Sequence, residues 1–281
     1  IPPLLLQREL SRSALARPAE LTAHDLALRA FTAIMQPEGD WLRLADDLLS
    51  QAGPHVSVYF VRVWWHLMAI SQGYAADPSA KVSGANDSGA TDSGGTATAI
   101  SNAASGMDRN DPAALALLAH LQSVQHRDHG LASAMLDRVI DNFPLCALAW
   151  TLKSLILCRL GEGQSAIFHA EQAQAMPVLG PERAWRDHVT ALAHYIAGRY
   201  ADAVRWARVS ATQHHGLAAN ARVLAASLAV LGQLDEAYRA GAQVLMIDPT
   251  FRIGTWRARS LLPGDHRDDF AQRLRLAGLP A

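Results

Sequence analysis

Apolar residues between positions 218 and 249 recur every three or four residues in two blocks that Gly232 separates. The apolar positions are Leu224, Ala225, Leu228 and Leu231 in the first block and Leu234, Ala237, Gly241, Val244 and Leu245 in the second. This spacing predicts two helices, each with one apolar face, joined by a short turn and therefore antiparallel. The small residues Ala225, Ala237 and Gly241 are expected where the two helices face each other, because they let helix axes approach closely.

The loop between these helices has two further copies upstream. Each copy consists of a glycine, four other residues and an alanine, and the copies begin at Gly161, Gly198 and Gly232. A helix ends readily on glycine because glycine accepts the left-handed backbone conformation. The glycines lie 37 and 34 residues apart (198 − 161 and 232 − 198). A period of roughly 34 residues with one helix pair in each period is typical of tetratricopeptide repeats.

Further residues agree with the tetratricopeptide repeat (TPR) pattern, since Trp150 stands at the early aromatic position of one repeat and Pro249 at the terminal proline of another. A narrower resemblance is carried by residues 108–112 with the Ala-Leu-Ala-Leu-Leu-Ala run after them, 145–150, 197–200 and 276–280. In this order they resemble the TPR region that follows a winged-helix transcriptional regulator domain or a class III adenylate/guanylate cyclase domain in bacterial signalling proteins. The resemblance covers roughly residues 20–281. It implies an all-α fold, a TPR-like right-handed α-solenoid of about five to six antiparallel helix pairs.

Two segments lie outside the regular pattern. Residues 1–20 are predicted to form an N-terminal helical stub or linker, and residues 21–281 the solenoid. Because the chain opens on Ile1 rather than methionine, we expect an excised or processed piece of a longer protein. A flexible insertion is expected at about residues 77–96, because residues 84–95 contain no apolar side chain larger than alanine. Residues 84–95 are expected to be the first site of proteolysis. Helices ahead of the glycine-marked repeats are predicted at residues 26–35, 41–51, 56–74, 96–107, from Pro112 onward, and 131–142.

Composition favours a helical array and narrows the range of partners. Hydrophobic residues make up 50% and charged residues 18% of the chain. The net charge of −1 offers no electrostatic footprint for nucleic acid, so no direct nucleic-acid contact is expected. Residues 56–70 are interrupted by Arg62 and His66 and are too few to span a membrane, and their aromatic residues are interpreted as core. No signal peptide is visible, which indicates a cytoplasmic protein.

The residues that often carry chemistry have simpler interpretations here. The chain has no Gly-x-Ser-x-Gly, P-loop, dinucleotide-binding glycine or His-Glu-x-x-His motif, so we expect no enzyme activity and no cofactor. His120, His126 and His129 surround a loop whose Arg127 and Asp128 indicate a hydrated turn rather than a zinc site, and the neighbours His214 and His215 are interpreted likewise. Cys146 and Cys158 are 12 residues apart (158 − 146) on one predicted helix and cannot bridge each other.

The TPR resemblance implies where a partner would bind. In such arrays the first helix of each pair lines the concave groove, with its second, fifth, ninth, twelfth and thirteenth positions pointing inward. Counting from residues 112, 147, 184 and 218 gives the candidate groove residues His120, Thr151, Arg159, Trp185, His188, Tyr195 and Arg222. Simple solvation of an exposed face is the alternative. The two arginines favour an anionic feature in the partner, and alanine at both is expected to weaken binding while leaving thermal stability nearly unchanged.

The sequence therefore indicates a non-catalytic regulatory interaction module of a bacterial signalling or transcription-regulatory protein, binding a peptide, a protein or a small acidic ligand in its groove. The alternative is a free-standing scaffold or adaptor without an output domain. If the groove is not used, the convex face, the helix that carries Trp64 and Trp65, or a homodimer contact would take its place.

Overall fold

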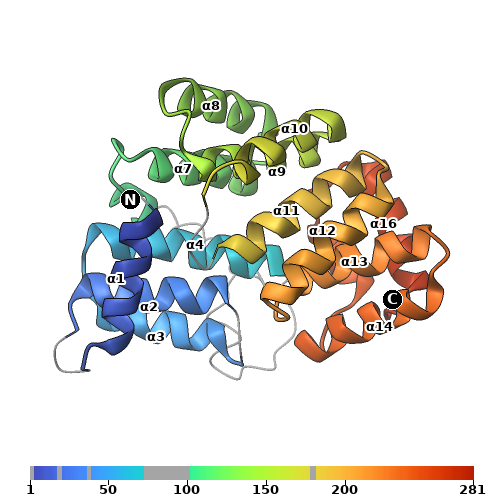
Figure 1. Ribbon diagram of the computed structural model, residues 1–281, viewed down its shortest axis with the longest axis horizontal. Coiled ribbons are helices and arrows are strands. Elements are labelled where there is room, and N and C mark those ends of the chain that lie inside the picture. Colours follow the sequence, from blue (N-terminus) through green and yellow to red (C-terminus); the bar gives the residue numbers. More distant parts are fainter. Residues whose placement is uncertain (1–2, 18–20, 37–38, 73–101, 178–181) are drawn as a thin grey trace. The chain divides into compact units, whose positions relative to one another are not determined.

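The computed structural model describes residues 3–17, 21–36, 39–72, 102–177 and 182–281 (Figure 1). Within these ranges every regular element is a helix and no strand occurs, which confirms the predicted all-α class. The chain forms two compact units. The first comprises residues 1–118 and 177–182, and the second comprises residues 119–176 and 183–281, so that the boundary falls within one helix.

The first unit contains α1 (Pro3–Leu15), α2 (Ala23–Met35), α3 (Trp41–Gln51), α4 (Val56–Gln72) and the start of α7 (Pro112–Gln125). A capping box begins α2: the Thr22 hydroxyl accepts from the Asp25 amide at 3.2 Å, and the Asp25 carboxylate accepts from the Thr22 amide at 3.0 Å. The same α2 segment anchors the N-terminal helix, since the Ser13 hydroxyl donates to the Asp25 carbonyl at 2.9 Å and Arg12 pairs with the Asp25 carboxylate at 2.7 Å.

Aromatic residues of α4 form the core of this unit, as the sequence indicates. Trp64 and Trp65 are each 2% exposed, and the Trp65 indole N–H donates to the Leu42 carbonyl of α3 at 3.0 Å. Phe31 of α2 meets Trp64 edge-on. The predicted insertion at residues 77–96 lies outside the described residues, as do the end of the 56–74 helix and most of the 96–107 helix, of which residues 102–105 are helical.

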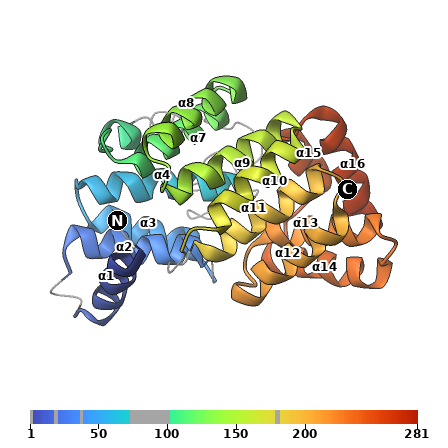
Figure 2. The same ribbon diagram turned by 45° about the horizontal axis from the view of Figure 1, so that its top comes forward.

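The second unit is a TPR-like solenoid of helix pairs. Its helices after the end of α7 are α8 (His129–Asn142), α9 (Ala147–Leu160), α10 (Gly163–Gln174), α11 (Arg183–Ile196), α12 (Tyr200–Gln213), α13 (Ala218–Val230), α14 (Leu234–Ile247), α15 (Ile253–Arg259) and α16 (Gly264–Leu276). We call α7, α9, α11 and α13 the A helices and their partners α8, α10, α12 and α14 the B helices. Figures 1 and 2 show α9 to α14 following one another as antiparallel pairs, with α11 touching both α9 and α13.

Three A helices end in the same hydrogen-bonded turn. Gly161, Gly198 and Gly232 have φ values of 79°, 73° and 74°, which confirms the left-handed conformation that the glycines predict. At the first turn, the Glu162 amide donates to the Leu157 carbonyl at 2.9 Å and the Gly161 amide to the Cys158 carbonyl at 3.2 Å. This is a Schellman motif, and the same pair of bonds recurs at residues 194–199 and 228–233. It satisfies carbonyls that the helix end would otherwise leave bare.

A fourth turn of the repeat carries arginine instead of glycine. Arg127, between α7 and α8, has a φ of 54° and is the one non-glycine residue with positive φ in the described chain. It precedes Gly161 by 34 residues (161 − 127), so the turns at 127, 161, 198 and 232 share one register. The glycine pattern does not include this turn, because its left-handed position is occupied by Arg127, whose side chain makes that conformation sterically unfavourable.

Replacing Arg127 by glycine is expected to raise the free energy of unfolding of the second unit by about 1 kcal/mol, because glycine relieves the left-handed strain at an exposed position. Urea unfolding of the variant and the parent chain measures this. Gly232→Ala at the equivalent turn is the matched control and should change stability in the opposite sense, since Gly232 has a φ of 74°. A destabilised Arg127→Gly variant would contradict the strain.

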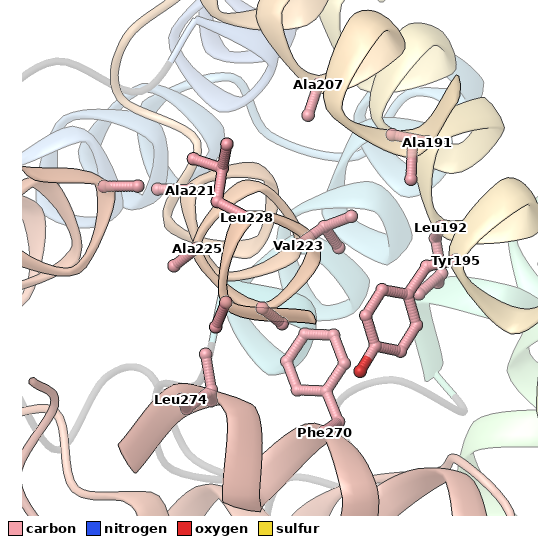
Figure 3. Close-up of a cluster of buried hydrophobic side chains, with 14 of the residues drawn as sticks. Ala191, Leu192, Tyr195, Ala207, Ala221, Val223, Ala225, Leu228, Phe270 and Leu274 are labelled. Carbon is pink, nitrogen blue, oxygen red and sulfur yellow. The ribbon is translucent and has the colours of Figure 1, made fainter. Parts of the chain in front are cut away.

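The core of the second unit joins A helices to the last helix of the chain (Figure 3). Tyr195 of α11, Leu228 of α13 and Phe270 of α16 are each 2% exposed. The Phe270 ring lies 4.9 Å from the Tyr195 ring and 5.0 Å from the Trp256 ring, measured between centroids. Helix α16 therefore covers the apolar end of α13 as a terminal cap, a role that the repeat pattern did not predict.

Small residues permit close packing, but one of them does so at an unexpected place. Ala225 and Ala237 are fully buried in the core, in agreement with the sequence. A Cβ atom at Gly241, however, would clash with the Ala277 carbonyl oxygen. The expectation that Gly241 opens space for α13 is therefore wrong: the close neighbour of Gly241 is the backbone after α16.

Candidate functional site

The candidate groove residues are far less exposed than solvated surface side chains. His120, Thr151, Trp185, His188, Tyr195 and Arg222 are between 2% and 8% exposed, and Arg159 is half-buried. The alternative of mere solvation does not apply to them. The expectation that alanine at Arg222 would leave stability unchanged assumed a surface side chain, whereas Arg222 is 3% exposed and its guanidinium lies 5.5 Å from the Phe251 ring.

Thr151 and Tyr195 use their hydroxyl groups in internal hydrogen bonds. The Thr151 hydroxyl donates to the Ala147 carbonyl of its own helix at 2.9 Å. The Tyr195 hydroxyl donates to the Asp269 carboxylate at 2.9 Å, and Arg273 donates to the same carboxylate at 3.0 Å. Burial and the neighbouring Asp269 raise the pKa of Tyr195, so it remains a neutral phenol. These contacts tie α11 to α16 and place the Tyr195 ring in the core.

His188 and Arg222 stand on adjacent A helices and influence each other electrostatically. Burial and, to a smaller extent, the positive charge of Arg222 lower the pKa of His188 to about 3, against a hydrogen bond with Asn220 that raises it. The next residue, Asp187, is also buried and accepts hydrogen bonds from Gln174 and Gln213. Burial raises the pKa of this carboxyl despite those bonds. Through these two hydrogen bonds Asp187 links α11 to α10 and α12.

Four polar side chains from the end of α7, the start of α8 and the end of α9 lie close together. Arg159 donates from Nη1 to the Ser123 hydroxyl at 2.6 Å, and the same nitrogen lies 3.5 Å from His120 Nδ1. The Ser123 hydroxyl lies 2.8 Å from His129 Nδ1. We call His120, Ser123, His129 and Arg159 the Arg159 cluster. Of its members, the sequence predicted His120 and Arg159 as groove residues, considered His129 only as a metal ligand, and missed Ser123.

Hydrogen-bond directions in the Arg159 cluster follow from the cation. Ser123 accepts from the guanidinium and still has its own proton to donate to His129 Nδ1. In that arrangement the neutral His129 ring carries its proton on Nε2, where it can donate. Burial lowers the pKa of both His120 and His129, and the charge of Arg159 lowers each further. Both rings are thus neutral at pH 7, beside a fixed positive charge.

Arg159 itself occupies an unusual position in the repeat. Two residues before the left-handed turn residue, the other repeats have Gln125, Ile196 and Val230. Burial lowers the pKa of Arg159 to about 9, which still leaves it positively charged at pH 7. No carboxylate of the described chain forms an ion pair with it, and its hydrogen bonds go to neutral side chains. An arginine where neighbouring repeats are uncharged is the sequence signal that could have identified this cluster.

The histidine, cysteine and acidic side chains of the described residues do not gather into a metal site. No group of three or more of these side chains is arranged to hold a metal ion. His214, which the sequence paired with His215, instead accepts through Nδ1 from the Gly216 amide at 3.0 Å. Among the helices described, none has both the length and the apolar character needed to cross a bilayer.

Comparison with known proteins gives matches among solved structures alone, since no family model and no curated protein matches the chain. MamA is 16% identical, with 56% of this chain and 91% of MamA covered and a TM-score of 0.42. YrrB, described as a TPR protein with an unusual peptide-binding site, is 17% identical with coverages of 64% and 89% and a TM-score of 0.42. The Cut9–Hcn1 structure of the APC/C is 14% identical with coverages of 96% and 51% and a TM-score of 0.49.

Proposed function

We propose that the chain is a non-catalytic interaction module that binds an acidic segment of a protein or peptide along the A helices of its second unit. The observation that carries this proposal is Arg159, a half-buried cation at the end of an A helix whose contacts within the described chain are all with neutral side chains. Guanidinium groups recognise carboxylates and phosphates through paired hydrogen bonds, and they do so most strongly where water is excluded. The repeated helix pairs supply the extended surface that such a segment needs.

The cellular setting is proposed from the sequence resemblance. In the favoured reading, the module belongs to a bacterial, cytoplasmic signalling or transcription-regulatory protein and modulates a winged-helix or cyclase output domain. The rival is a free-standing TPR scaffold. The reading frame upstream of Ile1 separates the two, because an output domain encoded there supports regulation and its absence supports the scaffold.

The binding proposal is tested by capturing partners from the source cell and titrating the captured segment calorimetrically. Arg159→Gln is expected to weaken its affinity about tenfold, since one charge-assisted contact is worth roughly 1.5–3 kcal/mol and part of it is replaced by the amide. Arg208→Gln serves as control, because Arg208 is exposed and already paired with Glu236. Equal affinities of Arg159→Gln and the parent chain would move the binding site elsewhere, including to a homodimer contact or to a small-ligand site.

A further inference from the structure

We infer that the Arg159 cluster is a binding site for a single oxyanion, a carboxylate or a phosphate group, held between the end of α7, the start of α8 and the end of α9. The inference rests on the proposed function only in that the acidic segment would carry this oxyanion. It assigns the contact point, the donors and the chemistry of the group bound, and it can be tested with small anions alone.

The first argument is the charge of Arg159. A cation removed from water is costly unless a counter-charge or a full set of hydrogen-bond acceptors replaces its hydration. Within the described chain, Arg159 has the Ser123 hydroxyl at 2.6 Å and His120 Nδ1 at 3.5 Å, both reached from the same Nη1 nitrogen. The remaining guanidinium N–H groups make no hydrogen bond to a described residue. An oxyanion would supply both the missing charge and the missing acceptors.

The second argument is independent of Arg159 and comes from the turn beside it. Arg127 holds a φ of 54° where the three later turns of this register have glycine. Residues kept in a strained backbone conformation are concentrated at functional sites, where the strain is offset by what the residue does. Arg127 is close enough to His129 for its charge to act on that ring. Its side chain therefore adds a second positive charge at the same edge of the unit.

The acid nearest in sequence does not neutralise these charges. Asp128 accepts from the Leu131 amide at 2.9 Å and begins α8 as its N-cap. It acts on His129, raising its pKa, but forms no ion pair with Arg127 or Arg159 in the described chain. The carboxylate that the turn contains is thus already committed to the helix start.

The donors converge from three backbone segments. Arg159 offers its free N–H groups from α9, and His129 offers Nε2–H from α8 in the tautomer whose Nδ1 accepts from Ser123. Ser123 on α7 connects the two through its hydroxyl and holds both in place. A group with several acceptor oxygens suits this arrangement, whereas a metal cation would be repelled by Arg159.

The experiment measures the melting temperature of the full chain with sodium phosphate, sodium acetate or sodium chloride at equal ionic strength. The parent chain is expected to gain about 3 °C over chloride at an anion concentration about ten times the dissociation constant. Arg159→Gln should lose this gain. Arg273→Gln is the matched control, because Arg273 is also half-buried in the last turn of its helix but is paired with Asp269. It should keep the gain.

A second variant covers the case in which Arg159→Gln does not fold. Arg127→Gly removes the other positive charge and is expected to fold more stably, so a reduced anion gain in it supports the site by itself. A gain with phosphate alone assigns a phosphate, a gain with acetate alone assigns a carboxylate, and both support the site. Equal gains in all variants would overturn the inference, since excluded salts stabilise every variant alike. Equal gains would not contradict peptide binding measured by capture, and a failed capture would not contradict a gain in melting temperature with small anions. The two proposals can therefore fail separately.

Discussion

Phe270→Ala is expected to destabilise the second unit by about 3–5 kcal/mol, the usual range for emptying a buried aromatic site. Phe270 is 2% exposed and its ring lies within 5.0 Å of the Tyr195 and Trp256 rings. Helix α16 has few other apolar anchors, so its detachment would also uncover α13. Urea unfolding gives the size of the effect, and hydrogen exchange should rise first in α13 and α16.

The matched control for this prediction is Phe168→Ala on α10. Phe168 is 52% exposed, and removal of an exposed side chain usually changes stability by about 0.5 kcal/mol or less. If both variants lost the same stability, α16 would not be the packed cap that Figure 3 shows. If Phe270→Ala unfolded without earlier exchange in α13, the array would lose its repeats together rather than from the capped end.

Acidification is expected to destabilise the chain between about pH 6.5 and pH 5, with His188 as a main cause. The pKa of His188 is about 3 in the folded chain, below the ordinary value of 6.5. As pH falls through 6.5, the His188 ring therefore becomes protonated in the unfolded chain while it stays neutral in the folded chain. Stability is fully present above that value and is lost at up to roughly 1.4 kcal/mol per pH unit for this one group. Buried His120 acts in the same direction.

The measurement is the free energy of unfolding against pH for the parent chain, His188→Gln and His215→Gln. The slope for His188→Gln should be shallower by about 1 kcal/mol per pH unit, whatever its stability at pH 7. His215 is exposed, and His215→Gln should keep the parent slope. Parallel curves for all three chains would show that His188 becomes protonated in the folded state and is not held neutral by burial.

The glycine pattern predicted much of the second unit because its cause is local. Gly161, Gly198 and Gly232 mark turns whose backbone conformation few other residues adopt, and the structure places each of them in the left-handed region. The same pattern misses Arg127, because it relies on glycine at left-handed positions and Arg127 adopts that conformation although it is not glycine. Cys146 and Cys158 do not bridge each other, as their spacing along one predicted helix requires.

The candidate site was less predictable because it depends on packing between repeats. Counting positions along the repeats predicted that Tyr195 lines the groove. Helix α16, which lies outside the counted repeats, covers Tyr195, and Asp269 of that helix accepts a hydrogen bond from the Tyr195 hydroxyl. Ser123 could not be recognised in isolation, since it matters only through Arg159 on the next A helix. The informative signal in the sequence is a charged residue, Arg159, at a position where the neighbouring repeats have uncharged residues.

The most direct test of the central claim is hydrogen exchange of the full chain with and without the captured acidic segment. The account predicts slower exchange at the ends of α7 and α9 and at residues 126–129, extending along α11 and α13, and much weaker slowing in Arg159→Gln at a segment concentration near the dissociation constant of the parent chain. Slower exchange confined to the B helices α10, α12 and α14, or the same pattern in Arg159→Gln, would contradict binding through the A helices and the Arg159 cluster.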